Sequence, residues 1–385
     1  MLILKIVFRN LFRNRLRTAL TVLGVATAIL AFALLRILVG AWYSGVEASS
    51  ATRLVTRNAV SLIFSLPLSY FERIRQIDGV SKVSYGSWFG GYYIEEKNLF
   101  ANFAVEPRSY LELYPEFVLS AAGKEAFLRD RRACVAGRKI AEKFGWTVGD
   151  VVPLKGTIFP GDWEFVLKGI YRGKDRTTDE TQFFFHWDYL NEVVRKTMPR
   201  RADQVGFYLV GVARPDLAAE VAADIDKSFR NSIAETLTET EKAFQMGFVA
   251  MTGALVTIIQ VISMLVVVII LAVVANTMVM TTRERIGEYA VLKCLGFGRR
   301  HVSAIIVGES AAVTLAGCAL GLAVTVPTAR RIGQELSNFF PVFHMEPGTV
   351  LWAFGAALAM AVAAGAVPAW RAARLRVAEG IARIA

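Results

Sequence analysis

Residues 281–301 read TTRERIGEYAVLKCLGFGRRH, and this stretch decides the fold because it lies between two long apolar runs, 247–280 and 302–326. Its charge, on about three turns of a predicted helix, comes from Arg283, Glu284, Arg285, Glu288 and Lys293. One side of that helix stays apolar through Ile286, Ala290, Val291 and Leu295, and Gly296 and Gly298 end it. This connecting segment (281–301) is either a docking element that carries force into two membrane spans or an ordinary charged loop that stops translocation.

The overall composition is that of a membrane protein. The 385 residues are 54% hydrophobic, their mean hydropathy is +0.43, and their formal net charge is +11. A basic chain can bind nucleic acid, but the basic residues here cluster beside the apolar runs. We therefore predict contact with membrane lipid and no nucleic-acid partner.

Four apolar runs are each long enough to cross a hydrocarbon core of roughly 30 Å. The predicted spans are 18–41, 246–280 with its stalk, 302–326 and 349–370. The first run is longer than the apolar part of a cleaved signal peptide, so we expect it to be retained. The basic start, 1–17, is either a helix lying in the membrane interface or a plain positive flank of the first span.

The positions of the basic residues predict the orientation of the chain. They occur at the start, in the connecting segment and in the tail, 371–385. Because basic flanks favour the cytoplasmic side, both termini should be cytoplasmic. The large stretch 42–245 and the short loop 327–348 should then lie outside.

Residues 42–245 have the polarity of an aqueous domain and are numerous enough to form their own core. Strand-like and helical segments alternate, and about 130–190 is richer in glycine and β-forming residues. The predicted fold class is an α-helical membrane protein with four transmembrane helices plus a large extracytoplasmic α/β (α+β) domain with an inserted β-rich subdomain. Residues 228–280 are expected to form one nearly continuous helix.

The third apolar run contains an unusual carboxylate, Glu309, and several small residues. A carboxylate inside a span is costly unless it is paired, so we expect Glu309 to contact Arg299, Arg300 or a neighbouring span; a proton relay is the alternative. Gly317 and Gly321 allow close approach of another helix.

The sequence lacks the motifs of common catalytic and metal sites. GxxxxGK[ST], GxGxxG, GxSxG, HExxH and CxxC are all absent. Cys134, Cys294 and Cys318 fall outside, inside and within the membrane in the predicted topology, so no disulfide is expected. We predict a non-catalytic subunit without cofactor or metal.

The layout of one span, a large outer domain and three further spans resembles the MacB/FtsX-like permeases of ABC transporters, including the lipoprotein-releasing LolC/LolE-like type. The resemblance is carried by RER at 283–285, EYAVLK at 288–293 and LGF at 295–297. Further matches are Glu309 with Gly317 and Gly321, PAWRAARL at 368–375, and RNLFRNRLRTALTVLG at 9–24.

This resemblance implies that the connecting segment contains a coupling helix that docks on a separate ABC ATPase. The implied coupling residues are Arg283, Glu284, Arg285, Ile286, Gly287, Glu288, Leu292, Lys293 and Gly296. It also implies the bacterial inner membrane, two ATPase copies and a second permease copy in a homodimer or heterodimer. Glu309, Gly317 and Gly321 would then serve pairing and packing between helices.

Two functions follow from the resemblance. The first is transmission of ATP-driven motion to a periplasmic domain, which exports or extracts a lipid, lipoprotein, peptide or drug, with a periplasmic adaptor and an outer-membrane channel as further partners. The second is FtsX-like signalling that activates an extracytoplasmic partner such as a cell-wall hydrolase. The connecting segment has the same role in both.

Overall fold

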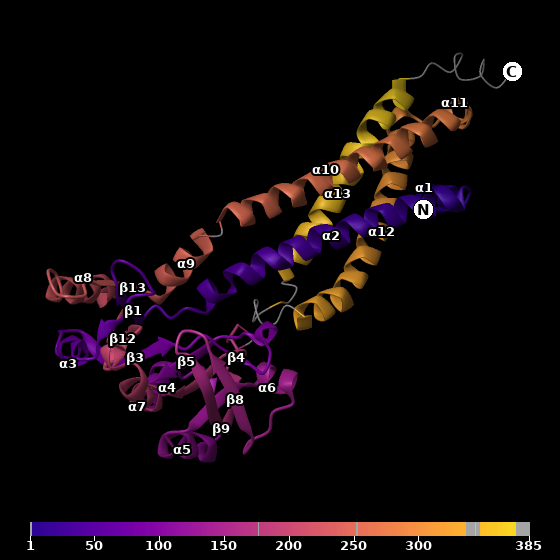
Figure 1. The fold of residues 1–385 in the computed structure, drawn as a ribbon. Helices are drawn as coiled ribbons and strands as arrows, with labels where there is room; N and C mark the ends of the chain where they lie inside the picture. The colour runs from indigo at the N-terminus through magenta and orange to yellow at the C-terminus, as the bar shows by residue number, and fades with distance from the viewer. Residues whose placement is uncertain (1, 176, 252, 336–342, 344–346, 375–385) are drawn as a thin grey trace. The chain divides into compact units, whose positions relative to one another are not determined.

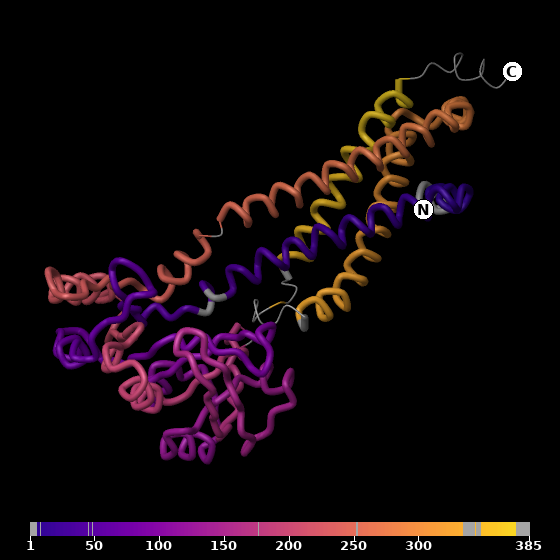
Figure 2. The backbone as a smooth tube through the Cα atoms, in the orientation of Figure 1, coloured from indigo at the N-terminus to yellow at the C-terminus, as the bar shows by residue number. Residues whose placement is uncertain are grey.

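The computed structural model describes residues 2–175, 177–251, 253–335, 343 and 347–374 (Figures 1 and 2). The chain divides into two compact units. The helical unit comprises Met1–Gly40, Gly253–Ile332 and Phe343–Ala385, and the sheet unit comprises Ala41–Thr252 and Gly333–Val342.

Four helices in the described residues are long and apolar enough to cross a membrane. They are α2 (Arg15–Ala48), α10 (Gly253–Glu284), α12 (Arg299–Glu335) and α13 (Pro347–Arg374). The short helix α1 (Leu2–Leu11) precedes α2, and α11 (Ile286–Cys294) joins α10 to α12. The basic start thus forms α1 and the first residues of α2, with a turn between them.

The helices of the helical unit share two apolar clusters. One joins the four long helices through side chains such as Ile29, Val274, Cys318 and Met360. The other, the α11 cluster, packs Val7, Tyr289, Val302, Ile305, Ile306, Ala369 and Ala372 around α11. Many apolar side chains of α10 remain exposed, as expected for a helix whose surroundings are lipid.

Helices and strands alternate in the sheet unit. Its helices are α3 (Tyr70–Arg75), α4 (Pro107–Leu113), α5 (Ala121–Arg129), α6 (Arg138–Phe144), α7 (Trp187–Thr197), α8 (Ala218–Ser228) and α9 (Glu241–Met251), with 3-10 turns η1 (Glu96–Asn98), η2 (Pro199–Arg201) and η3 (Pro215–Leu217). Its strands are β1 (Arg53–Asn58), β2 (Leu66–Pro67), β3 (Val80–Trp88), β4 (Gly91–Tyr93), β5 (Asn102–Val105), β6 (Phe117–Val118), β7 (Ala133–Gly137), β8 (Val151–Gly156), β9 (Gly161–Gly173), β10 (Phe183–His186), β11 (Gln204–Val205), β12 (Phe207–Val212) and β13 (Thr236–Thr240).

Eleven of these described strands form one mixed sheet in the order β13-β1-β12-β3-β5-β10-β7-β9-β8-β4, with β6 paired to β9. The pairs β5–β10 and β7–β9 are parallel, and the other pairs in the sheet are antiparallel. The β-rich insert supplies β7, β8, β9 and β10, so its strands continue the sheet. The predicted fold class, four membrane helices plus a large α/β domain, is confirmed.

Successive side chains of a strand point to opposite faces of the sheet, and each face of this sheet packs into its own apolar cluster. In β10, Phe183 and Phe185 join one cluster, which also contains Ile140 of α6 and Val221 of α8. Phe184 joins the other cluster, whose helical members come from α4 and α5. Helices therefore cover both faces.

The prediction of one continuous helix over 228–280 is wrong. After α8 ends at Ser228, the chain forms β13, which pairs with β1 at the edge of the sheet. Thr238 fits this strand because its hydroxyl lies 2.9 Å from that of Thr56 and 2.8 Å from the Asp226 carboxylate. The long helical run begins only at Glu241, the first residue of α9.

Candidate functional site

The connecting segment folds as the end of α10, the short helix α11 and the start of α12. The predicted single helix from Arg283 is interrupted at Arg285, whose φ of −105° and ψ of 14° leave helical geometry. Gly296 ends α11 as predicted, with a φ of 91° that suits glycine. The Phe297 N–H then donates to the Leu292 carbonyl at 3.1 Å. These two breaks fix the length of α11.

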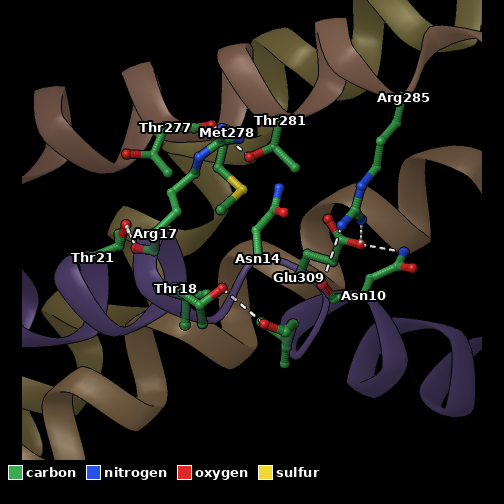
Figure 3. Close-up of a pocket in the computed structure, with 12 residues that line it drawn as sticks. Asn10, Asn14, Arg17, Thr18, Thr21, Thr277, Met278, Thr281, Arg285 and Glu309 are labelled. Atoms are coloured by element: carbon green, nitrogen blue, oxygen red, sulfur yellow. Dashed lines mark hydrogen bonds and ion pairs between the residues drawn. The ribbon is translucent and has the colours of Figure 1, made fainter.

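Arg285 and Glu309 form a buried ion pair, which Figure 3 shows together with Asn10. Arg285 Nη1 lies 2.7 Å from Glu309 Oε1, and each side chain is only 6% exposed. The Asn10 amide also donates to Glu309 Oε1, and Arg285 Nη2 donates to the Asn10 carbonyl at 3.1 Å. Asn10 of α1, Arg285 before α11 and Glu309 of α12 are therefore held together.

This geometry corrects two expectations. Glu309 does not pair with Arg299 or Arg300, which lie nine or ten residues earlier on the same helix, roughly 14 Å away along its axis. Arg285, one of the implied coupling residues, is not open to a docked partner, because it is buried against Glu309. A carboxylate in a span does take a partner, as predicted, but the partner comes from the connecting segment.

Three further polar contacts tie the connecting segment to other helices. Glu284 accepts two hydrogen bonds from Arg17 of α2, at 2.7 and 2.9 Å. Glu288 is paired with Arg13, which lies between α1 and α2. Lys293 Nζ donates to the carbonyls of Ala372 and Ala373 at 2.9 and 3.0 Å, at the carboxyl end of α13. A cation is favourable at that end of a helix.

Two apolar side chains of the α11 segment face outward, beside the exposed Glu288. Val291 and Leu295 are 48% and 72% exposed. Of the other predicted coupling residues, Arg283, Glu284, Glu288 and Gly296 are exposed, and Ile286, Gly287, Leu292 and Lys293 are half-buried. Leu292 packs against the α11 cluster. The sequence placed Val291 and Leu295 on an apolar side but gave no sign that this side faces outward.

A small cavity lies beside the ion pair. Figure 3 shows its lining from α1, α2, α10 and α12, including Asn14, Thr18 and Thr281. Its volume of about 30 Å³ accommodates a water molecule and not a drug-sized ligand. Among the described residues, no group of three or more His, Cys, Asp or Glu side chains fits a metal ion. The polar contacts of this region join helices α1, α2 and α12 to the connecting segment.

Gly317 and Gly321 bring α12 close to α2. A Cβ atom at Gly317 would lie 2.6 Å from Val25 Cβ, and one at Gly321 would lie 2.7 Å from the Ala26 carbonyl oxygen. Only glycine fits such distances without displacement of the neighbouring helix. Both residues are buried at this contact.

Comparison with known proteins gives two family matches. The family described as MacB-like periplasmic core domain matches residues 18–228, more than half of the 385 residues, and FtsX-like permease C-terminal matches residues 260–377. An uncharacterized ABC transporter permease of Methanocaldococcus jannaschii, MJ1507, is 24% identical over 98% of this chain and 96% of its own length.

Two solved structures are similar to about half of the chain. The extracellular domain of the noncanonic ABC-type transporter YknZ from Gram-positive bacteria is 10% identical, with a TM-score of 0.36 over 49% of this chain and 100% of its own. The periplasmic region of MacB from Actinobacillus actinomycetemcomitans is 8% identical, with a TM-score of 0.37 over 53% of this chain and 95% of its own. On the two family matches, which together extend from residue 18 to residue 377, the chain belongs to the MacB/FtsX-like permeases of ABC transporters.

Proposed function

We propose that this permease carries ATP-driven motion from a separate ATPase, docked on α11, to its large extracytoplasmic domain. The motion exports or extracts a lipid, lipoprotein, peptide or drug. The active assembly contains two permease copies and two ATPase copies in the cytoplasmic membrane. The permease itself hydrolyses no ATP.

The observation that carries this proposal is the set of ties around α11. Arg285 joins the start of α11 to α1 and α12, Glu284 joins the end of α10 to α2, and Lys293 joins α11 to α13. A loop that only stops translocation needs charge but no contacts with other helices. The contacts around α11 involve every long helix of the helical unit. A displacement of α11 is therefore passed to those helices instead of being absorbed locally.

Val291 and Leu295 supply the anchors for the ATPase. Val291 and Leu295 lie about one helical turn apart and are both exposed, and a central apolar anchor contributes about 2 kcal/mol or more to binding. Arg283, at the end of α10, and Glu288 set orientation at the rim. Ile286 and Leu292, two of the implied coupling residues, are half-buried and therefore offer less surface to a partner.

We predict that Leu295→Ala weakens ATPase binding roughly thirty-fold, the equivalent of about 2 kcal/mol. The measurement is ATPase activity that co-purifies with tagged full-length permease from its own host membranes. Leu358→Ala is the matched control, because Leu358 of α13 is 55% exposed but lies within a membrane span. Equal ATPase recovery with both variants would remove α11 as the docking site.

Transmission itself is tested by hydrogen exchange on the intact permease–ATPase complex. ATP with vanadate, compared with ADP, should change amide exchange in α11 and also in α9 and β13 of the sheet unit. A change confined to the connecting segment would contradict transmission and leave only docking.

The orientation predicts a defined labelling pattern. Cys134 is fully buried, so it cannot report topology, but Cys294 is exposed, and Lys155→Cys introduces an exposed thiol on β8. In intact spheroplasts a membrane-impermeant maleimide should label Lys155→Cys and not Cys294, and after permeabilisation it should label both. Labelling of Cys294 in intact spheroplasts would place α11 outside and overturn the proposed function.

A further inference from the structure

A buried ionic cluster lies in the sheet unit where the chain passes between membrane helices and sheet. Arg53 is the first residue of β1, shortly after α2, and Glu241 is the first residue of α9, directly after β13. Both are buried, with exposures of 5% and 7%. Since β1 and β13 pair side by side, the link from α2 to β1 lies beside the junction of β13 with α9.

Arg53 uses all three of its guanidinium nitrogens. Nε donates to Glu241 Oε2 at 2.9 Å, Nη1 to the Leu113 carbonyl at 2.6 Å, and Nη2 to Glu116 Oε1 at 2.6 Å. The guanidinium carbon lies 3.9 Å from the centre of the Tyr114 ring. Arg53 therefore links α9 to the end of α4 and to the residues that follow it.

Glu241 completes the Arg53 cluster, which we define as Ser50, Arg53, Tyr114, Glu116 and Glu241. Its carboxylate accepts from the Ser50 N–H at 2.8 Å and from the Tyr114 hydroxyl at 3.0 Å. Ser50 lies in the short link between α2 and β1. One carboxylate thus holds the passage from α2, the start of α9 and the end of α4.

The charges of the cluster support each other. Burial alone would lower the pKa of Arg53, but the hydrogen bond with Glu116 and the nearby Glu241 raise it, so the guanidinium stays charged. Burial, followed by the charge of Glu241, raises the pKa of Tyr114 well above its usual value, so its hydroxyl keeps the proton that it donates. The contacts of Arg53 with the two carboxylates are charge-assisted.

The cluster also reaches the far part of the sheet. Glu116 directly precedes β6, which pairs with β9 through Phe117 and Gly173, and the Glu116 carbonyl accepts from the Lys174 N–H at 2.9 Å. β9 in turn pairs with β7 and β8. A path of hydrogen bonds therefore runs from Glu241 through Arg53 to the β-rich insert.

We propose that Arg53 is a positioning residue that locks α9 to the α4–β6 segment and β9, so that the sheet unit follows α9 as one body. The inference rests on the proposed function, because that function supplies the movement of α9. The inference assigns the rigid connection between α9 and the rest of the sheet unit, here called the joint, to the Arg53 side chain. Lysine cannot replace it, because an ammonium lacks the planar fork that reaches three acceptors in different directions.

The test measures the distance between spin labels at Lys242→Cys on α9 and Lys155→Cys on β8 in full-length permease carrying Cys294→Ser. Both sites are exposed, and Cys134 and Cys318 are buried. Without nucleotide, Arg53→Met should roughly double the width of the distance distribution, since a broken buried ion pair loosens the groups it joined. Arg53→Lys should broaden it less.

The matched control is Arg57→Met. Arg57 of β1 pairs with Glu239 of β13 at 3.2 Å, across the same two strands, and its Nη1 donates to the carbonyl of the neighbouring Asn58 at 3.3 Å. In Arg57→Met the distance distribution between the two spin labels should stay as narrow as in the wild type. If Arg53→Met folds poorly, Arg53→Met with Glu241→Gln removes both charges of the pair and should still broaden the distribution.

The outcomes separate this inference from the proposed function. If the spin-label distance distribution is as narrow in the Arg53 variants as in Arg57→Met, Arg53 does not lock α9 to the rest of the sheet unit. This conclusion does not depend on the ATPase measurements. Broadening without nucleotide supports the joint even if ATP leaves amide exchange in α9 unchanged, a result that would contradict only the proposed function.

Discussion

Replacing Arg285 with methionine should destabilise the helical unit by about 3–5 kcal/mol, because it leaves the buried Glu309 carboxylate without its cation. The same change removes the hydrogen bond from Arg285 to the Asn10 carbonyl, so α1 loses a tie as well. Glu309→Gln should cost less, since glutamine keeps an oxygen that accepts from Arg285 and Asn10. The measurement is thermal unfolding of detergent-solubilised permease, followed by size-exclusion chromatography.

The double variant Arg285→Met with Glu309→Leu separates stability from transmission. Apolar replacement of both members of a buried pair is often neutral for stability, so its unfolding temperature should return close to that of the wild type. The link from α11 to α12 is nevertheless lost, and nucleotide-dependent exchange in α9 should fall. A single Arg285→Met variant as stable as the wild type would show that the ion pair contributes little.

Leucine at Gly317 and Gly321 together should prevent correct packing of α12 on α2. Even the first added carbon would lie 2.6 Å from Val25 Cβ or 2.7 Å from the Ala26 carbonyl oxygen, and both contacts involve atoms close to or in the backbone of α2. Overpacking of this kind costs about 1–3 kcal/mol or more per site, so the double variant should give little folded protein. The yield of monodisperse permease after solubilisation measures this.

Gly24→Ala is the matched control for this prediction. Gly24 lies on α2 directly before Val25 and Ala26, which contact Gly317 and Gly321, but a Cβ there would meet nothing within 4 Å. Alanine favours a helix over glycine by about 1 kcal/mol, so Gly24→Ala should fold at least as well as the wild type. A normal yield from the double leucine variant would mean that α2 and α12 do not pack at these glycines.

For Glu309, the sequence predicts the need for a partner but not the partner itself. Its position in an apolar run is enough to predict that it needs a partner, because an unpaired carboxylate is costly there. The sequence offers Arg299, Arg300 or a neighbouring span as its partner, whereas the structure brings Arg285 and Asn10, from two other segments, to it. Neither residue differs from its neighbours by any local signal.

In the sheet unit too, contacts between distant segments are not predicted by local sequence patterns. The sequence favours helix across the residues of β13, because the alternating threonines and charges of this strand lie next to a long helical run. Arg53 and Glu241 are 188 residues apart in the chain, and no motif links them. Their pairing depends on β1 and β13 lying side by side.

The sequence by itself determined the four membrane helices, the outer α/β domain, the family resemblance and the end of α11 at Gly296. These are local properties, since apolar length, strand periodicity and a glycine with positive φ act within a few turns of chain. Only the tertiary structure decided that Arg285 is buried, that Val291 and Leu295 face outward, and which acid each arginine neutralises. Burial and ion pairing depend on which distant segments share a surface, and that is fixed only when the helices and the sheet pack.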